Sequence, residues 1–465
     1  MRSIKNSLNP VSFIILFLFG CVFFQCKPED EVFDFSFSNG LTFSADTILF
    51  DTIFTGAGST TKRFKVYNQS KQALKISNIQ LAGGASSPYK IYVNGIETIQ
   101  SEDVGILGKD SLLMLVEVFI DPIDKNSPYL VNDSILFETN GISQDIKLIA
   151  WGQDANYLGN VVLPCNTNWT KDRPYLIYSS ILIDTLCQLT IEPGTKIFGA
   201  KDAYIYVKGK IITEGTSDER ILFQNQRQDP AYENLPGQWG GIVLLEGSHG
   251  NSMNFTTIRN AVYGIRLGSP DQDTIPDIVM KNMIIENMSN SGILAFTSDL
   301  YAENVLIDNC IEFNCGNIAG GNYTYKHCTF ANYGYNFIRQ NPSFYIADNI
   351  QLDDGSMIIE DIYVSIKNTI LDGNLEDELF FNLDGGAPYT FEFNNSIFKT
   401  SIADLDTLGN ILNTDPKFIN PSRYDYRLDT LSPAKDMGIF VGVTSDLDGN
   451  ARDNFPDIGA YERIE

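Results

Sequence analysis

One short pattern of apolar and polar residues recurs between residues 253 and 400. Its copies begin at residues 253, 280, 302, 325, 366 and 393, and they read MNFTTIRN, MKNMIIEN, AENVLIDN, YKHCTFAN, IKNTILDG and FNNSIFKT. Self-similarity at a period of about 20 to 50 residues is typical of repeat architectures. The pattern therefore predicts a solenoid.

Within each copy, strict alternation would place the first, third, fifth and seventh side chains on one face. The first position is apolar, but the third is mostly Asn and the strongly apolar position is the sixth. The third position holds Asn282, Asn304, Asn368 and Asn395, with Phe255 and His327 as variants. The alternation changes phase at this position, which predicts a corner between short strands on successive sides of a coil.

A second phrase falls between copies of the first. It reads GGIVLL, YGIRLG and SGILAF, with its central residue at Ile242, Ile265 and Ile293. Two interleaved strand phrases imply at least two strands per turn, and no window shows helical periodicity. We therefore predict an all-β chain with a parallel β-helix, whose equivalent residues stack about 4.8 Å apart.

Stacking explains the residue types at two positions and makes a prediction for a third. Asn side chains at the corner can bond to one another as a ladder, and the sixth-position residues fill the interior. The seventh position should point outward. We interpret it as a solvated outer face of mixed charge rather than a catalytic column; it holds Arg259, Glu286, Asp308, Ala331, Asp372 and Lys399.

The N-terminus predicts export. Residues 1–25 contain Arg2 and Lys5 followed by an apolar run over 11–24, which is typical of a signal peptide and short for a membrane span. Cys26 is followed by KPEDE, which resembles the acidic export tag of surface lipoproteins in the Bacteroidetes. This resemblance implies lipid attachment at Cys26 and a cell-surface protein of the outer membrane. Cys21, in LFGC, is an alternative anchor, and a cleaved signal without lipid is another.

After a tether over 26–33, residues 34–156 alternate as short strands separated by turn residues. RFKVYN, ALKISNIQL, LLMLVEVFI and DIKLIAWG begin at residues 63, 73, 112 and 145. Such a series predicts an immunoglobulin-like β-sandwich. It also resembles the sandwich modules of bacterial surface proteins, which implies no catalytic residue.

Residues 157–432 are predicted to form the β-helix and residues 433–465 its closing segment and cap. LTIEPGTKIF and IYVKGKIITEGT near the start, and DLDGNARDNFPDIGAYE near the end, resemble bacterial right-handed parallel β-helix proteins with pectate-lyase-like topology. The acidic DLDGN stretch (446–450) lacks the Gly and distal Glu of a calcium loop, so a capping turn is preferred to calcium.

The cysteines divide into two groups. Cys165 and Cys187 lie near the entry to the solenoid, where an oxidising compartment would allow a disulfide that pins the first coil. Cys310, Cys315 and Cys328 lie further along the chain. The sequence is compatible with a Cys310–Cys328 disulfide and with buried free thiols. Their spacing matches no zinc pattern, and no metal or cofactor is predicted.

The longest interval between copies, 41 residues, predicts an insertion over residues 334–361. Insertions in solenoids map to loops that often bind. Aromatic rings beside Arg and Asp suit a sugar, so the predicted carbohydrate-binding residues are Tyr335, Arg339, Tyr345, Asp353 and Asp354. The alternative is a loop whose aromatics pack on the coil beneath.

Charge and missing motifs narrow the function. A net charge of −25 without a basic patch argues against nucleic acid. A lyase needs acids on calcium or an arginine, together with a base, and no such local motif is present around His249, His327 or the acids 271, 273 and 277. We therefore predict a non-catalytic polysaccharide-binding or adhesion protein. A lyase or hydrolase acting on acidic glycans, and a structural stalk for protein contacts, are the alternatives.

Overall fold

The computed structural model describes residues 32–36, 40–268, 275–335 and 337–464. The chain divides into two compact units. The first comprises Met1–Asp121 and Leu130–Trp151, and the second comprises Pro122–Tyr129 and Gly152–Glu465. In the described part of the chain no helix is long and apolar enough to cross a membrane. Residues 1–25, Cys21 and Cys26 lie outside the described residues.

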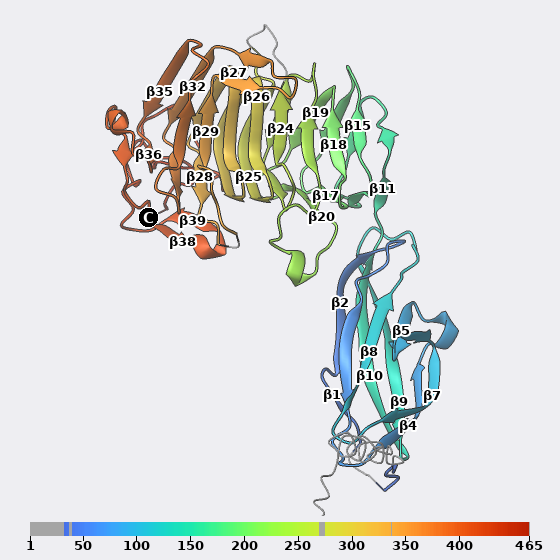
Figure 1. The fold of residues 1–465 in the computed structure, drawn as a ribbon. Coiled ribbons are helices and arrows are strands. Elements are labelled where there is room, and N and C mark those ends of the chain that lie inside the picture. The colour runs from blue at the N-terminus through green and yellow to red at the C-terminus, as the bar shows by residue number, and fades with distance from the viewer. Residues whose placement is uncertain (1–31, 37–39, 269–274, 336, 465) are drawn as a thin grey trace, which may run out of the picture. The chain divides into compact units, whose positions relative to one another are not determined.

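The first unit is built from two five-stranded sheets (Figure 1). One sheet has the order β1 (Thr42–Phe43), β3 (Lys62–Tyr67), β8 (Ser111–Val118), β5 (Tyr89–Val93) and β6 (Ile96–Thr98). The other has the order β2 (Thr47–Phe54), β10 (Ile142–Gln153), β9 (Tyr129–Thr139), β4 (Leu74–Leu81) and β7 (Gln100–Ile106).

The two sheets pack face to face through alternate side chains. Phe64 of β3 meets Phe137 of β9 at a ring distance of 6.5 Å, and Phe50 of β2 meets Tyr89 of β5 at 6.0 Å. The strands expected at RFKVYN, ALKISNIQL, LLMLVEVFI and DIKLIAWG are confirmed as β3, β4, β8 and β10. The immunoglobulin-like character of this sandwich stays a prediction.

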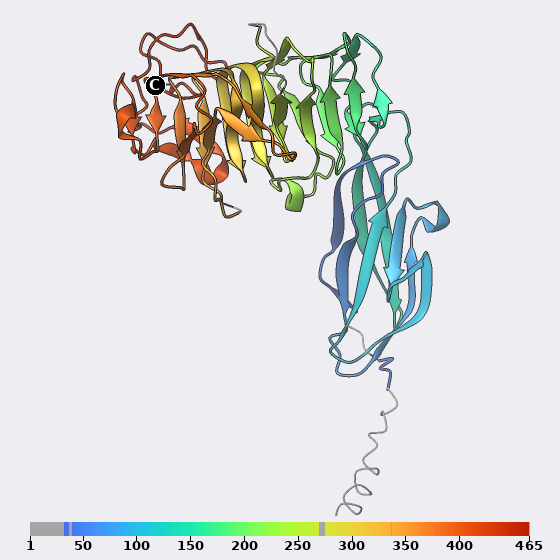
Figure 2. The ribbon, with the colours of Figure 1, turned by 45° about the horizontal axis from the view of Figure 1, so that its top comes forward.

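The second unit is a solenoid, and the all-β parallel solenoid predicted from the repeat is confirmed (Figures 1 and 2). Its strands pair in parallel with the third strand along the chain, so each coil has three sides, which we name faces A, B and C. The second phrase stacks in register, since Ile242 pairs with Ile265 and Ile265 with Ile293. Right-handed winding stays a prediction.

The short strands each belong to one face. Face A holds β11 (Asn156–Leu158), β14 (Tyr175–Ile177), β17 (Lys196–Gly199), β20 (Ile221–Asn225), β23 (Thr256–Arg259), β28 (Thr329–Asn332), β33 (Ile370–Gly373), β36 (Ile397–Phe398) and β37 (Ile411–Leu412). Face B holds β12 (Val161–Val162), β15 (Ile181–Ile183), β18 (Tyr204–Val207), β21 (Gly241–Leu244), β24 (Ile265–Gly268), β29 (Phe344–Ala347) and β34 (Leu379–Asn382). Face C holds β13 (Thr167–Trp169), β16 (Gln188–Ile191), β19 (Lys210–Glu214), β22 (Asn251–Asn254), β32 (Ile362–Lys367) and β35 (Tyr389–Asn394).

Longer strands bend around the corners, and a few short elements lie outside the faces. The bending strands are β25 (Ile278–Met288), β26 (Ser291–Cys310) and β27 (Phe313–Lys326). Outside the faces lie the hairpins β30 (Asn349–Gln351) with β31 (Met357–Ile359) and β38 (Phe418–Asn420) with β39 (Asp425–Leu428). The 3₁₀ turns are η1 (Gly84–Ser86), η2 (Pro230–Tyr232), η3 (Ala403–Leu405) and η4 (Pro421–Arg423).

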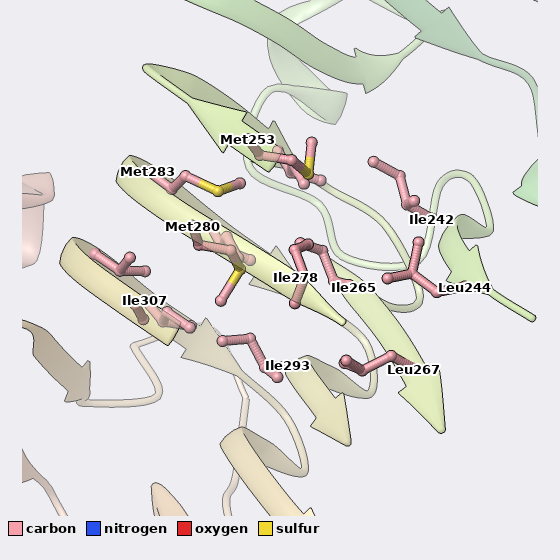
Figure 3. Packing of buried hydrophobic residues seen from close by; sticks show 14 of the residues in the cluster. Ile242, Leu244, Met253, Ile265, Leu267, Ile278, Met280, Met283, Ile293 and Ile307 are labelled. Atoms are coloured by element: carbon pink, nitrogen blue, oxygen red, sulfur yellow. The ribbon is translucent and has the colours of Figure 1, made fainter. Parts of the chain in front are cut away.

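The interior of the solenoid is filled by apolar columns. Figure 3 shows Ile242, Ile265 and Ile293 one after another on successive coils, facing Met280 and Ile307. All five are fully buried. Burial of each such side chain contributes about 2 kcal/mol, so the stacked columns account for the stability of a long, open-ended sheet.

The corner between faces C and A carries the predicted ladder. Asn304 donates from Nδ2 to Asn282 Oδ1 at 2.9 Å, and Asn368 Nδ2 bonds to His327 Nε2 at 2.8 Å. These bonds confirm the ladder and His327 as its member. The corner residues are left-handed, with φ near 50° at Asn282, Asn304 and His327. Asn and His tolerate this conformation better than other non-glycine residues, which explains the residue choice.

The closing segment runs back along this ladder. Asn395 donates to Met437 O, Asn368 to Ile439 O and Asn304 to Ser445 O. The apolar residues of this segment and of the preceding β38–β39 hairpin cover the outside of face A, where Leu306, Ala331, Ile370 and Ile397 form a second core with Phe418, Tyr426, Leu428, Ala434, Leu447, Ile458 and Ala460. The segment therefore packs along the side of the solenoid, an arrangement that the sequence did not predict.

This cover corrects the prediction for the seventh position. Asp308 is 0% exposed, rather than lying on a solvated face. The reason is that Tyr426 on β39, together with the closing segment, occupies the space outside face A. Asp446 makes the capping turn preferred from the sequence, because its carboxylate accepts bonds from the backbone N–H groups of Asp448, Asn450 and Glu462.

Candidate functional site

Face B presents one outward residue per coil in a single straight column. Pairing in register aligns Tyr206, Val243, Arg266, Leu294, Gly316, Tyr345 and Phe380. Tyr206, Arg266, Tyr345 and Phe380 reach the surface, whereas Val243, Leu294 and Gly316 between them are buried. Six steps of about 4.8 Å give this column a length of roughly 29 Å. Their neighbours on each strand, such as Ile205 and Phe344, point into the core, so period-2 alternation turns these side chains outward.

Aromatic rings follow this column, and we call them the aromatic stripe. It consists of Tyr204, Tyr206, Phe296, Phe313, Tyr345 and Phe380, with Arg266 among them. Tyr204 stacks beside Tyr206 at 5.6 Å, and Tyr345 stacks on Phe313 at 5.1 Å and on Phe380 at 5.9 Å. The Arg266 guanidinium lies 5.5 Å from the Phe296 ring centre. Phe380 is 49% exposed.

Hydrogen-bonding groups accompany the rings. The Tyr345 hydroxyl accepts a bond from Asn382 Nδ2 at 3.2 Å, which leaves its own proton free to donate. Arg266 is exposed, and its guanidinium has hydrogen-bond donors but no acceptor atom. Burial raises the pKa of Tyr204, so its hydroxyl stays protonated. The stripe thus offers flat apolar surfaces flanked by donors.

Of the five predicted carbohydrate-binding residues, Tyr345 lies on this stripe. Arg339 does not, and its predicted role is wrong. The Arg339 side chain is 0% exposed, forming an ion pair with Glu378 at 2.7 Å and bonding to Asn374 and to Asn341 O. Its charge is satisfied inside the protein, so it has no donor to offer a ligand at the surface.

The remaining three predicted residues lie apart from Tyr345. Tyr335 follows β28, is 47% exposed and stacks on Tyr333 at 5.7 Å. Asp353 and Asp354 lie at the exposed tip of the β30–β31 hairpin, where Asp354 accepts bonds from Ser356 and thereby stabilises the turn. Backbone and side-chain bonds from Ser356 lower the pKa of Asp354.

The predicted insertion is therefore not one loop. Strand β29 is a regular part of face B and separates residues 333–343 from the hairpin that follows it. The sequence missed this because β29 (Phe344–Ala347) does not repeat the earlier glycine-containing phrase. It missed Tyr206 and Phe380 for the same reason, although an aromatic residue next to an inward apolar residue was a usable signal in both.

A separate hollow lies between face A and residues 413–421, which precede the closing segment. Its volume is about 460 Å³, and it is lined by Tyr333, Asp372, Gly373, Lys399, Asn413, Thr414, Asp415, Lys417, Phe418 and Pro421. The Tyr333 hydroxyl donates to Asp372 Oδ2. Burial raises the pKa of Asp372, while the bond from Tyr333 and the charge of Lys399 oppose this rise. Asp372 is thus a candidate proton donor.

Further acids on face A are shielded. Glu286 pairs with Arg259 at 2.9 Å, and Asp308 lies on the next coil in register with Glu286. Burial raises the pKa of both carboxyls, and their mutual repulsion raises that of Asp308 further. The hydroxyl of Tyr426 lies beside the Asp308 carboxyl and opposes part of the rise in the pKa of Asp308. Asp308 is 0% exposed, and it does not line the hollow beside face A that is described above.

The cysteines and histidines are placed as follows. Cys165 and Cys187 are joined by a disulfide with a Cα–Cα distance of 4.4 Å. Cys310, Cys315 and Cys328 are buried free thiols. Burial lowers the pKa of His327 well below its ordinary value, so the ladder contains a neutral imidazole. Over the described ranges no group of three or more His, Cys, Asp or Glu residues could hold a metal ion.

Comparison with known families agrees with this geometry. Residues 161–274 match a family model, the pectate-lyase like beta helix domain. The match begins at β12 and includes the first coils of face B with Tyr204, Tyr206 and Arg266. A pectate-lyase-like domain suggests a carbohydrate-related role. No curated protein matches the chain.

The solved structures that match this chain include distant ones. They include the E. coli chaperone DraB (10% identity, 24% of this chain and 54% of that one, TM-score 0.17). A family 123 glycoside hydrolase from Clostridium perfringens matches at 10% identity over 28% of this chain and 30% of its own, with a TM-score of 0.19. A Porphyromonas gingivalis W83 protein of unknown function matches at 11% identity over 26% and 59%, with a TM-score of 0.18. The chain covers less than two thirds of each of these proteins.

Proposed function

We propose that the solenoid binds a polysaccharide along the aromatic stripe of face B without cleaving it. The observation that carries this proposal is the column of outward residues from Tyr206 to Phe380, one on each coil. The rise between coils is comparable to the length of one sugar residue. A linear glycan laid along the axis therefore advances by about one sugar per coil, and it meets the accessible residues Tyr206, Arg266, Tyr345 and Phe380 along the way.

The chemistry of the stripe suits this role. Aromatic rings such as Tyr345 and Phe380 are flat and lose little conformational entropy on binding. They can pack against the C–H face of a sugar, while Arg266 and the Tyr345 hydroxyl donate to sugar hydroxyls. The rings are held by stacking on neighbouring coils, so the surface is organised before the ligand arrives.

The stripe also lacks what cleavage needs. Glycoside hydrolysis uses a pair of carboxyl groups across the scissile bond, and lyase chemistry needs a base and a charge-neutralising group. The seven residues of the column include no carboxylate. Binding is therefore the function that this face supports.

Affinity electrophoresis in gels that contain neutral and acidic polysaccharides tests the proposal. Chain from residue 27 onward, which includes every described residue, should be retarded by at least one glycan. Tyr206→Ala and Tyr345→Ala should each weaken binding about five- to thirtyfold, as expected for an aromatic contact of about 1–2 kcal/mol. Tyr301→Ala is the matched control, because Tyr301 lies on face C. Equal retardation of all variants would refute the proposal.

Asp372 favours a second candidate, a glycan-cleaving enzyme that uses the hollow beside face A. Its raised pKa and its contact with Tyr333 suit a general acid. In that case Asp372→Asn should abolish cleavage while Asp415→Asn, at the rim of the same hollow, should spare it. The absence of cleavage by the unsubstituted chain would remove this candidate.

We also propose that the protein is a lipoprotein of the outer membrane, exposed on the cell surface and anchored at Cys26. The support is the apolar run over 11–24 and the acidic residues after Cys26. Surface anchoring would hold the glycan-binding solenoid where polysaccharide is met. If no glycan binds, the alternative is that the protein is a structural stalk for contacts with other proteins.

A further inference from the structure

A second hollow lies at the corner between faces B and C, across the first coils. Its volume is about 260 Å³. The turns of successive coils supply its walls: Thr185–Gln188, then Lys208–Lys210, then Gly247 and His249. Asn166, beside the disulfide, closes it from the first coil. None of these residues belongs to the aromatic stripe or to the hollow beside face A.

The turns that form this corner hollow are tied to one another. The backbone N–H groups of Lys208 and Lys210 donate to Ile183 O at 2.8 Å and to Cys187 O at 2.9 Å. Between them, Gly209 lies so close to the coil beneath that an added Cβ would meet Cys187 O at 2.1 Å. Buried Ser248 donates to Gly209 O at 2.9 Å, fixing the turn above. The disulfide holds Cys187 itself, so the walls are preorganised.

The charge of the hollow is opposite to that of the protein. The chain carries 58 acidic and 33 basic residues, yet the lining contains Lys208, Lys210 and His249 and no carboxylate. Among the described residues, none of these three side chains has an ion pair or side-chain hydrogen bond. Basic groups gathered without acidic partners in so acidic a chain suit an anion.

The types of basic side chain in the hollow indicate which class of anion it suits. The fork of Arg matches carboxylates and phosphates alike, whereas Lys is a compact point charge with three rotatable donors that also binds phosphate. The hollow contains Lys and His but no Arg. Gln188 and Asn166 add neutral amide donors. These donors come from the turns of successive coils, so they approach the hollow from several sides, which suits the tetrahedral oxygens of a sulfate or phosphate group.

The hollow adjoins the start of the aromatic stripe. Lys208 lies in the bend directly after β18, two residues beyond Tyr206, so the hollow begins where the first aromatic strand of face B ends. At the rim, Leu186 is 96% exposed and has φ of 61°, an uncommon conformation for a non-glycine residue. An exposed apolar side chain held in this way provides a contact for the sugar ring that carries the anion.

We propose that this hollow binds the sulfate or phosphate ester group of a glycan whose sugar rings lie on the aromatic stripe. The proposal rests on the proposed function for its sugar contacts, but not for its anion contacts. The aromatic stripe then selects for a linear chain, and the corner hollow selects for an anionic substituent at one end of the bound segment.

Two matched glycan pairs test this selectivity. Affinity is measured for chondroitin sulfate against desulfated chondroitin, and for phosphomannan against dephosphorylated mannan. The unsubstituted protein should prefer one esterified member on the order of tenfold, since two lysines at a partly exposed site each contribute a few-fold. The pair that shows the preference identifies the ester.

Lys208→Gln combined with Lys210→Gln should remove that preference and leave binding of the unesterified member unchanged. Lys171→Gln combined with Lys196→Gln is the control, because it removes the same charge from exposed lysines outside the hollow. A preference that survives in the first variant, or that is lost equally in the control, would overturn the proposal. Equal affinity for both members of each pair would overturn it as well.

Calorimetric titration with sodium sulfate and sodium phosphate separates this inference from the proposed function. If no glycan binds, the proposed function fails, and the titration alone decides whether the corner hollow binds an anion. Binding of either ion that disappears in the Lys208→Gln, Lys210→Gln variant but persists in the control supports an anion site. Absence of binding by both ions, together with absence of ester preference, contradicts it.

Discussion

At the residue scale, Arg339 and Glu378 hold residues 333–343 against face A and face B. Both side chains are fully buried, and Glu378 also accepts bonds from the backbone N–H groups of Ser343 and Leu375. Removing one member of such a pair leaves a buried charge without a partner. The ion pair therefore has a structural role in place of the ligand-binding role predicted for Arg339.

Arg339→Ala should lower the free energy of unfolding of the solenoid by about 3–5 kcal/mol. Lys171→Ala, which breaks the exposed pair with Glu219, should cost about 1 kcal/mol or less. Urea unfolding of both variants, followed by circular dichroism, measures the difference. Similar losses for the two variants would contradict the assigned role of Arg339.

The burial of Asp308 predicts that the stability of the folded protein depends on pH. Its pKa in the folded protein is raised well above the ordinary value of 3.8, by burial first and then by Glu286. The folded state therefore binds this proton more tightly than the unfolded state does. Stability should fall as the pH rises above 3.8 towards the raised pKa, because the charge of ionised Asp308 is buried away from water.

Asp308→Asn should stabilise the protein by roughly 1–3 kcal/mol at neutral pH and by less near pH 4. Unfolding free energies from urea titrations at several pH values, compared with those of the unsubstituted chain, test this. The exposed Asp406→Asn serves as the control. A constant difference across the pH range would mean that Asp308 does not titrate as described.

The corner residues show how far sequence reasoning reached at this scale. The phase change at Asn282 and Asn304 located the corner and the ladder, because a polar residue interrupts an apolar alternation. The left-handed backbone of these residues was not deduced, although Asn tolerates it. The burial of Asp308 was not predictable, because the residues that cover it lie more than a hundred positions later in the chain.

At the element scale, the disulfide fixes the first coils. Cys165 and Cys187 occupy the turns after β12 and β15, and 22 residues separate them. A crosslink closing a loop of that size removes unfolded-state entropy worth about 3 kcal/mol. The turns that it joins also form one side of the corner hollow.

Cys165→Ser combined with Cys187→Ser should destabilise the solenoid by about 3 kcal/mol. Hydrogen exchange should show faster opening of β12 to β16 in this variant, while β25 to β27 retain their protection. Cys328→Ser is the comparison, since Cys328 is a buried free thiol. Unchanged exchange at β12 to β16 would contradict a role for the disulfide in holding the entry coils.

Repetition decided which elements were predictable. Strands that share a phrase, such as those containing Ile242, Ile265 and Ile293, were found with their register. Strand β29 (Phe344–Ala347) shares no phrase with the other strands, so the sequence predicts a loop there. Because β29 is a strand of face B, the residues expected to form one site around Tyr345 lie apart. Its neighbours in register, Gly316 and Phe380, become visible only when the coils are stacked.

At the scale of the whole molecule, the two units differ in how their stability arises. The sandwich closes its core between two sheets. The solenoid relies on its closing segment, which crosses several coils through Asn304, Asn368 and Asn395. Sequence repeats cannot reveal such a cover, because the covering segment does not itself repeat.

The proposed anchor makes a prediction for the whole chain in cells. Metabolic labelling with a fatty acid should label the protein, and Cys26→Ala should abolish the label while Cys21→Ala retains it. Protease added to intact cells should degrade the anchored protein if it is exposed at the surface. Loss of the label in Cys21→Ala but not in Cys26→Ala would place the anchor at Cys21. Absence of label in the unsubstituted protein would refute lipid anchoring.

The central claim is that face B binds a glycan and does not cleave it. The most direct measurement incubates the chain from residue 27 onward with a panel of neutral and acidic polysaccharides, with and without calcium, and separates the products by gel filtration. The account predicts that one glycan co-elutes with the protein at its original size. It also predicts that Tyr206→Ala combined with Tyr345→Ala abolishes co-elution. Shortened glycan in the protein sample would contradict the claim and direct attention to Asp372.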